Sequence, residues 1–155
     1  NNPPHREFAK RLKKVTGCKI VALTHLDEFV KSDEGYADET PYDVDPADFL
    51  NLIRNAAYVC TDSFHCSVFS ILYRKQFFTF RRYSRNTKQS TNSRLDTLFS
   101  LTGVKGRLLT GNEKIEDCLK IETDYTEVHQ KLDDVRKQSY AYLEAALADE
   151  RSTDL

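Results

Sequence analysis

The stretch that decides the fold is Tyr58–Tyr73, YVCTDSFHCSVFSILY. It predicts a short buried strand over 58–61, a tight polar turn over 62–64, and a helix that begins at His65. A histidine, two hydroxyls and a carboxylate therefore stand where a strand ends and a helix begins. Free backbone N–H groups and the helix dipole attract anions there, and ligands of open α/β sheets bind at this edge. We predict a site for a phosphate- or carboxylate-bearing ligand at this turn.

Helical and strand patterns alternate on both sides of this stretch. Asn2-Pro3-Pro4 is expected to begin a helix that Gly17 ends, and Lys19–Thr24 (KIVALT) is typical of a buried parallel strand. Asp45 is expected to cap a helix that begins at Pro46. The remaining expected elements are strands over 76–80 and 107–110 and helices over 93–101 and 124–148. This alternation predicts an α/β fold in which a parallel sheet is flanked by helices on both faces.

The length of 155 residues suits one domain. We predict this domain over residues 1–148, followed by a frayed tail over 149–155. The chain has no methionine, not even at position 1, and it opens on a helix. We therefore expect it to be a piece of a longer protein whose sheet has lost its first strand at one edge or at its centre.

Composition argues against several classes of protein. A net charge of −1 provides no field for nucleic acid. No apolar run approaches the roughly 18 residues that span a bilayer, so no membrane span is expected. The four cysteines form no CxxC pair, and His5, His25 and His129 have no ligand spacing, so we predict no metal. Cysteines as small buried hydrophobes indicate a reducing compartment, and hence the cytoplasm.

The TDSFH turn (61–65) and the apolar helix after it resemble the carboxyl-terminal part of the polysaccharide pyruvyl transferase family. Supporting blocks are DFLNLIRNA (48–56), KQFFTF (75–80), NSRLDTLFSLTG (92–103) with Arg107 after it, and VRKQSYAYLEAAL (135–147). The resemblance covers about residues 5–147. Two positions depart from it: Cys66 stands where many members have glycine, and Ser63 where some have a basic residue.

The resemblance implies a Rossmann-like domain that forms the carboxyl-terminal half of a GT-B-like two-domain fold. The amino-terminal domain would then be missing from this chain. It also implies transfer of a pyruvyl group from phosphoenolpyruvate to a sugar hydroxyl of a cell-surface polysaccharide or its precursor, with no cofactor beyond that donor. Core packing is expected to explain the apolar spacing of the last helix, unless that helix crosses to the first domain.

His65 is the candidate catalytic residue, for donor binding or for protonation of the leaving group, because histidine titrates near neutral pH. The hydroxyls of Thr61, Ser63 and Ser67 are candidate substrate ligands, although serine also caps helices readily. Asp62 is expected to support the site by orienting His65 or by accepting backbone N–H groups.

Three arginines are candidates for clamping the anionic donor: Arg81, Arg82 and Arg94. The sequence alone leaves the choice open. It also leaves open a GT-B-type glycosyltransferase that uses a nucleotide sugar, and a non-catalytic anion-binding fragment. A nucleic-acid-binding module is disfavoured by the net charge.

Overall fold

Three short parallel strands form the centre of the fold in the residues that the computed structural model describes, which are 3–23, 30–81 and 92–150. They are β1 (Tyr58–Thr61), β2 (Gln76–Phe80) and β3 (Leu108–Leu109), side by side in that order. β1 pairs with β2 along its whole length, and β3 pairs with the end of β2. The predicted parallel sheet flanked by helices is confirmed, although the sheet is small.

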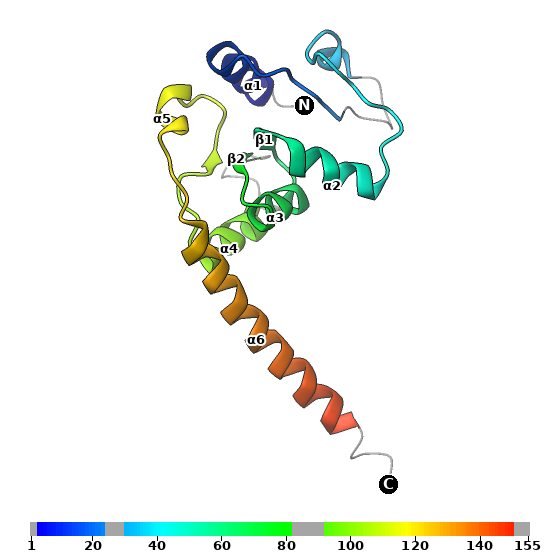
Figure 1. Ribbon diagram of the computed structural model, residues 1–155, viewed down its shortest axis with the longest axis vertical. Coiled ribbons are helices and arrows are strands. Elements are labelled where there is room, and N and C mark those ends of the chain that lie inside the picture. Colours follow the sequence, from blue (N-terminus) through cyan, green and yellow to red (C-terminus); the bar gives the residue numbers. More distant parts are fainter. Residues whose placement is uncertain (1–2, 24–29, 82–91, 151–155) are drawn as a thin grey trace.

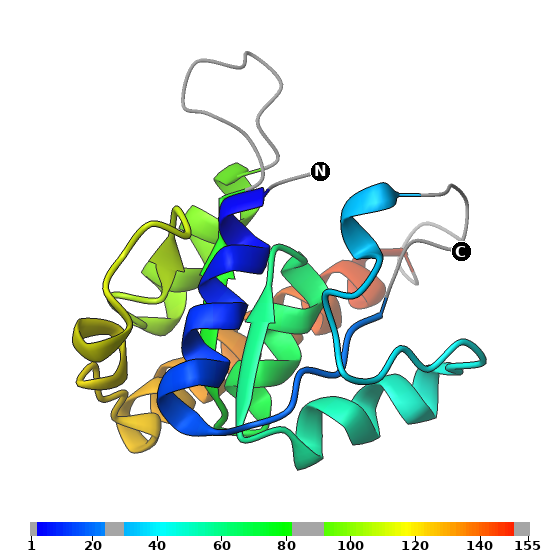
Figure 2. The ribbon, with the colours of Figure 1, turned by 90° about the horizontal axis from the view of Figure 1, so that it is seen from above.

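Helices cover both faces of this sheet (Figures 1 and 2). Because side chains alternate along a strand, Phe77 faces one side and Phe78 and Phe80 face the other. α1 (Pro3–Thr16) and α5 (Ile115–Leu119) pack on the Phe78 side. The Phe77 side is covered by α2 (Pro46–Asn55), α3 (Phe64–Leu72), α4 (Asn92–Thr102) and the first part of α6 (Tyr125–Glu150).

Side chains cap the starts of α2 and α3, and the cap of α2 is the predicted one. The Asp45 carboxylate accepts a hydrogen bond from the N–H of Asp48 at 2.8 Å, and Pro46 occupies the first helical position of α2. α3 begins at Phe64, one residue before its expected start, with Ser63 as the cap. The cap at Asp45 therefore predicted the start of α2, whereas the cap at Ser63 places the start of α3 one residue earlier than expected.

The prediction of a buried strand over Lys19–Thr24 is wrong for residues 19–23, and Thr24 lies outside the described residues. This segment makes a single parallel bridge, between Val21 and Glu39. Val21 is 38% exposed and Leu23 is 48% exposed. The apolar run pairs with a polar loop instead of with the sheet, and a strand needs a neighbouring strand to satisfy its backbone.

The second half of α6 lies outside the core, which corrects the expectation that its apolar residues pack there. Val128 is 4% exposed and Leu132 packs on the core, whereas Leu143 and Leu147 are more than half exposed. Figure 1 shows the helix projecting away from the other elements. The 3.6-residue apolar period predicted the helix correctly, but it carries no information about which half has a partner.

Two short helices are absent from the sequence expectations. They are the 3₁₀ helix η1 (Lys31–Asp33) and the helix α5 (Ile115–Leu119). With 3 and 5 residues, neither is long enough to display a helical apolar repeat.

Gly111, in the turn after β3, lies close to the backbone at the start of α1. Its φ is +96°, and a Cβ there would lie 2.8 Å from the backbone carbonyl carbon and oxygen of Pro4. Arg11 locks the same contact by donating to the carbonyl oxygens of Gly111 at 2.6 Å and Glu113 at 2.8 Å. The amino end of α1 is therefore held by a backbone approach that only glycine permits.

Gly111→Ala is expected to lower the free energy of unfolding by about 2–4 kcal/mol, because left-handed strain adds to a clash with rigid backbone. Chemical denaturation measures this loss. Gly17→Ala is the matched control: Gly17 has φ +74° but nothing within 4 Å of a built Cβ, so it carries the strain alone. Its expected cost is about 1–2 kcal/mol. Equal losses for both variants would contradict the proposed clash.

Candidate functional site

The amino ends of several helices lie at the carboxyl edge of the sheet, where the parallel strands end. β1 leads through Asp62 into α3, and Arg81 directly follows β2. The starts of α1 and α4 also lie toward this edge in Figure 2, although the two helices pack on opposite faces of the sheet. Because α/β proteins bind ligands outside the carboxyl ends of their strands, this edge is the place to look for a site.

Hydroxyls of the TDSFH turn are used largely within the turn itself. The Thr61 hydroxyl accepts a hydrogen bond from the N–H of Ser63 at 3.0 Å. The Ser63 hydroxyl accepts from the N–H of Cys66 at 3.4 Å and so caps α3. These contacts match the capping interpretation that the sequence left open beside the substrate-binding one.

Ser67 points inward rather than toward the edge. Its side chain is fully buried at 0% exposure. The hydroxyl donates to the carbonyl oxygen of Ser63 at 2.8 Å or shares a hydrogen bond of equal length with the Thr79 hydroxyl of β2. Ser67 therefore ties α3 to the sheet, and this geometry gives it no access to a ligand at the edge.

His65, by contrast, is exposed in the first turn of α3. Its ring lies edge-on to the Phe64 ring, with centroids 5.6 Å apart. Within the described part of the chain its imidazole nitrogens make no hydrogen bond. A ligand at the helix start would thus find both ring nitrogens available.

Arg94 and Arg81 differ in what holds their guanidinium groups. The Arg81 guanidinium makes two hydrogen bonds to the Asp96 carboxylate, at 2.8 and 3.3 Å. Arg94 lies over the Phe64 ring at 5.5 Å from its centroid, and no carboxylate among the described residues pairs with it. The structure thus brings Arg94 beside the residue that precedes His65. The third candidate, Arg82, lies outside the described residues.

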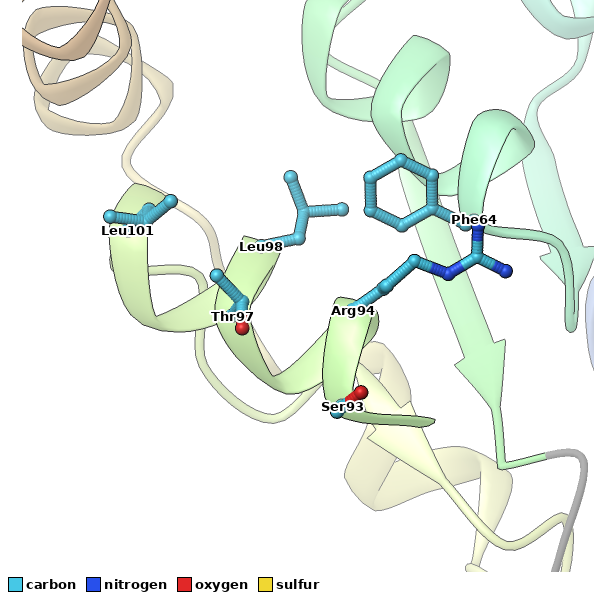
Figure 3. Close-up of a pocket in the computed structure, with 6 residues that line it drawn as sticks. All are labelled: Phe64, Ser93, Arg94, Thr97, Leu98 and Leu101. Carbon is cyan, nitrogen blue, oxygen red and sulfur yellow. The ribbon is translucent and has the colours of Figure 1, made fainter. Parts of the chain in front are cut away.

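A shallow open pocket separates the start of α3 from α4 (Figure 3). Phe64 and Leu98 form facing apolar walls, and Arg94 extends along its lower rim in that view. The lining residues are Phe64, Ser93, Arg94, Thr97, Leu98 and Leu101. An arginine beside an aromatic wall suits a small anionic ligand with an apolar part.

His5 also lies at this edge, although its sequence position gave no sign of it. Its ring stacks on the Phe80 ring at the end of β2, with centroids 4.5 Å apart and planes at 17°. Burial lowers the pKa of His5, while the Asp62 carboxylate and a hydrogen bond with the Arg81 backbone act in the opposite direction. The contacts that bring His5 here, of its ring with Phe80 and of Pro4 with Gly111, exist only in the tertiary structure.

No group of three potential metal ligands occurs among the described residues. Cys66 and Cys118 are buried, and burial raises the pKa of both thiols. His129 is half-buried, and its Nε2 lies 3.1 Å from the carbonyl oxygen of Ile71. His25 is among the residues that are not described.

No helix in the described ranges has the length and apolarity to cross a membrane.

Comparison with known proteins identifies the family. The family model for polysaccharide pyruvyl transferases matches residues 3–84, more than half of the chain. The chain belongs to the polysaccharide pyruvyl transferase family. Neither a curated protein nor a solved structure matches it. Membership in the polysaccharide pyruvyl transferases confirms the resemblance and indicates polysaccharide pyruvyl transferase activity in general.

Most of the candidate site falls inside the segment that matches the polysaccharide pyruvyl transferase model. His5, the turn from Asp62 to His65, and Arg81 lie within residues 3–84, whereas Arg94 lies beyond them. The family thus covers both histidines of the carboxyl edge. Arg94 reaches the site from α4, through its contact with Phe64.

Proposed function

We propose that this chain is the donor-binding domain of an enzyme that transfers a pyruvyl group from phosphoenolpyruvate to sugar hydroxyls, which leaves a ketal and free phosphate. The acceptor is a cell-surface polysaccharide or its precursor, and the reaction takes place in the cytoplasm. The domain acts as the carboxyl-terminal half of a GT-B-like fold, with an amino-terminal domain across the cleft. The observation that carries the proposal is the family match over the turn that exposes His65 at the start of α3.

The reaction sets clear requirements for this site. The methylene carbon of phosphoenolpyruvate gains a proton, two acceptor oxygens bond to its neighbouring carbon, and the bond from that carbon to phosphate oxygen breaks. The two protons from the acceptor hydroxyls balance the one on carbon and the one on released phosphate. His65 is suited to bind or protonate the phosphate, because its exposed nitrogens stand at the positive end of α3.

Arg94 is the arginine that we assign to the carboxylate or phosphate of the donor. Arg81 is already held by Asp96, so recruiting it would cost an existing ion pair. Arg94 instead lies over Phe64 and lacks a carboxylate partner among the described residues. Ser63 occupies a position that is basic in some family members, and Arg94 supplies a cation within reach of the same turn.

Titration with phosphoenolpyruvate, followed by calorimetry or NMR, tests this assignment. Arg94→Gln is expected to weaken binding about 10- to 100-fold, which corresponds to loss of a charge-assisted hydrogen bond worth about 1.5–3 kcal/mol. Arg54→Gln is the matched control. Arg54 is also exposed and lies over an aromatic ring, that of Tyr73 at 5.7 Å, but it belongs to α2. Its binding constant is expected to stay unchanged.

A parallel titration with a uridine diphosphate sugar separates the donor classes. Binding of the nucleotide sugar without binding of phosphoenolpyruvate would overturn the pyruvyl donor and favour a glycosyltransferase. Binding of phosphoenolpyruvate without any turnover, in the longest protein that the gene encodes, would favour a non-catalytic anion-binding fragment. Equal weakening by Arg94→Gln and Arg54→Gln would remove Arg94 from the site.

A further inference from the structure

Contacts with the ends of two strands hold α1 at the carboxyl edge. The Pro4 backbone meets Gly111 after β3, the His5 ring stacks on Phe80 at the end of β2, and Arg11 bonds the turn that contains Gly111. These contacts come from two neighbouring strands. The position of His5 is therefore fixed by the fold and does not depend on a flexible side chain alone.

Charged groups of both signs act on His5. The Asp62 carboxylate, in the turn between β1 and α3, favours the protonated form of His5, whereas the Arg6 guanidinium, which donates to the Asp33 carboxylate, disfavours it. Arg81, at the end of β2, contributes its backbone. His5 is only partly exposed, and one face of its imidazole stacks on the apolar Phe80 ring.

We propose that His5 is a second anion-binding histidine of this site, which takes up a proton and binds the phosphate group when a phosphate-bearing ligand occupies the carboxyl edge. This inference rests on the proposed function, because the ligand is the phosphorylated donor or the phosphate that it releases. His5 then closes the site from the α1 side of the sheet, while His65 binds from the α3 side.

The direction of the expected pH dependence follows from the surroundings of His5. In the free protein, burial holds the pKa of His5 below its usual value, so the imidazole is neutral near pH 7. A bound phosphate favours the cationic form and raises this pKa. Proton uptake therefore accompanies binding, and the phosphate affinity should fall as the pH rises through the titration of His5.

An NMR titration of the imidazole C–H resonances tests the proposal. Spectra are recorded from pH 5 to 8 with no addition, with inorganic phosphate, and with phosphoenolpyruvate. The midpoint of His5 is expected to rise by about one unit when either ligand is present. His129, on α6 and bonded to Ile71, is the internal control, and its midpoint should not move.

Two variants separate the charge of His5 from its packing. His5→Gln keeps a hydrogen-bonding group without a titrating charge, and His5→Phe keeps a ring that can stack on Phe80. Both are expected to lose about 10-fold in phosphate affinity at pH 5.5 and to show a flatter pH dependence than the unmodified chain. Circular dichroism confirms that each variant is folded.

The outcomes distinguish this inference from the proposed function. If the ligand shifts the imidazole resonances of both His5 and His65, both the inference and the proposed function are supported. If it shifts those of His5 alone, the inference is supported but His65 is removed from donor binding. If the ligand shifts the resonances of His65 alone, the role of His5 is overturned and the proposed function is still supported. If neither histidine responds to phosphoenolpyruvate or phosphate, both ideas fail.

Discussion

Replacing Arg107 with leucine is expected to lower the free energy of unfolding by about 3–5 kcal/mol. Arg107 directly precedes β3 and is fully buried, at 0% exposure. Its guanidinium donates to the carbonyl oxygen of Phe77 at 3.3 Å and to that of Ile121 at 2.7 Å. Leucine cannot donate, so it would leave these buried carbonyl oxygens without their donor.

The same guanidinium also contacts side chains from these two parts of the chain. It donates to the side-chain carbonyl oxygen of Gln76 at 2.8 Å and to the hydroxyl of Thr123 at 3.3 Å. It also packs between the rings of Phe77 and Phe78, whose centroids lie 5.9 and 5.5 Å away. Burial lowers the pKa of Arg107, and carbonyl and hydroxyl oxygens compensate for the lost water. One residue therefore links β2 to the segment before α6.

Urea denaturation of Arg107→Leu and of the unmodified chain measures this effect. Arg107→Lys retains the charge but not the several donors of the planar guanidinium, so an intermediate loss is expected. Arg54→Leu is the control on an exposed arginine that also lies over an aromatic ring, and it should cost less than about 1 kcal/mol. A similar small loss for Arg107→Leu would show that the buried hydrogen bonds are replaced by water.

Local signals in the sequence predicted the part of the fold that depends on neighbouring residues. The strand over 58–61, the strand over 76–80 and the cap at Asp45 are all confirmed. Each follows from a preference that acts within a few positions, such as apolar strand composition or a capping carboxylate. The family resemblance rested partly on these blocks, and the family match covers those that lie within residues 3–84.

Features that depend on distant contacts were missed or misplaced. The run over 19–23 has the composition of a buried strand, but its backbone pairs with residues 38 and 39. The apolar residues of α6 from Tyr140 onward have helical spacing without burial. Arg107 was expected in a last strand, and nothing in its sequence position indicates a fully buried cation. The composition of a segment indicates which side chains are suited to burial, but it does not indicate which other segment packs against them.

The candidate site shows the same division. The TDSFH spacing placed His65 at a helix start, and the structure exposes it there. Sequence spacing could not choose among the arginines, because the difference lies in the Asp96 carboxylate that holds Arg81 and the Phe64 ring under Arg94. His5 lies 60 positions before His65, and only the packing of α1 on Phe80 brings it to the same edge.

His65→Ala is expected to reduce kcat/KM for pyruvyl transfer by about 100- to 10,000-fold, the range for loss of a general acid or base. The assay uses the longest protein that the gene encodes, with phosphoenolpyruvate and a sugar acceptor, and follows phosphate release. Stability should stay within about 0.5 kcal/mol, because the His65 ring is exposed and makes no hydrogen bond within the described residues. Activity and stability are therefore expected to separate at this position.

His129→Ala provides the opposite pattern. His129 is half-buried on α6, and its Nε2 contacts the carbonyl oxygen of Ile71 at 3.1 Å, away from the carboxyl edge. Its replacement should cost about 1 kcal/mol of stability and leave kcat/KM unchanged. If His65→Ala retains full turnover, His65 is a structural residue of the α3 start. If both histidine variants lose activity in proportion to stability, the loss of turnover reports unfolding and not chemistry at the turn.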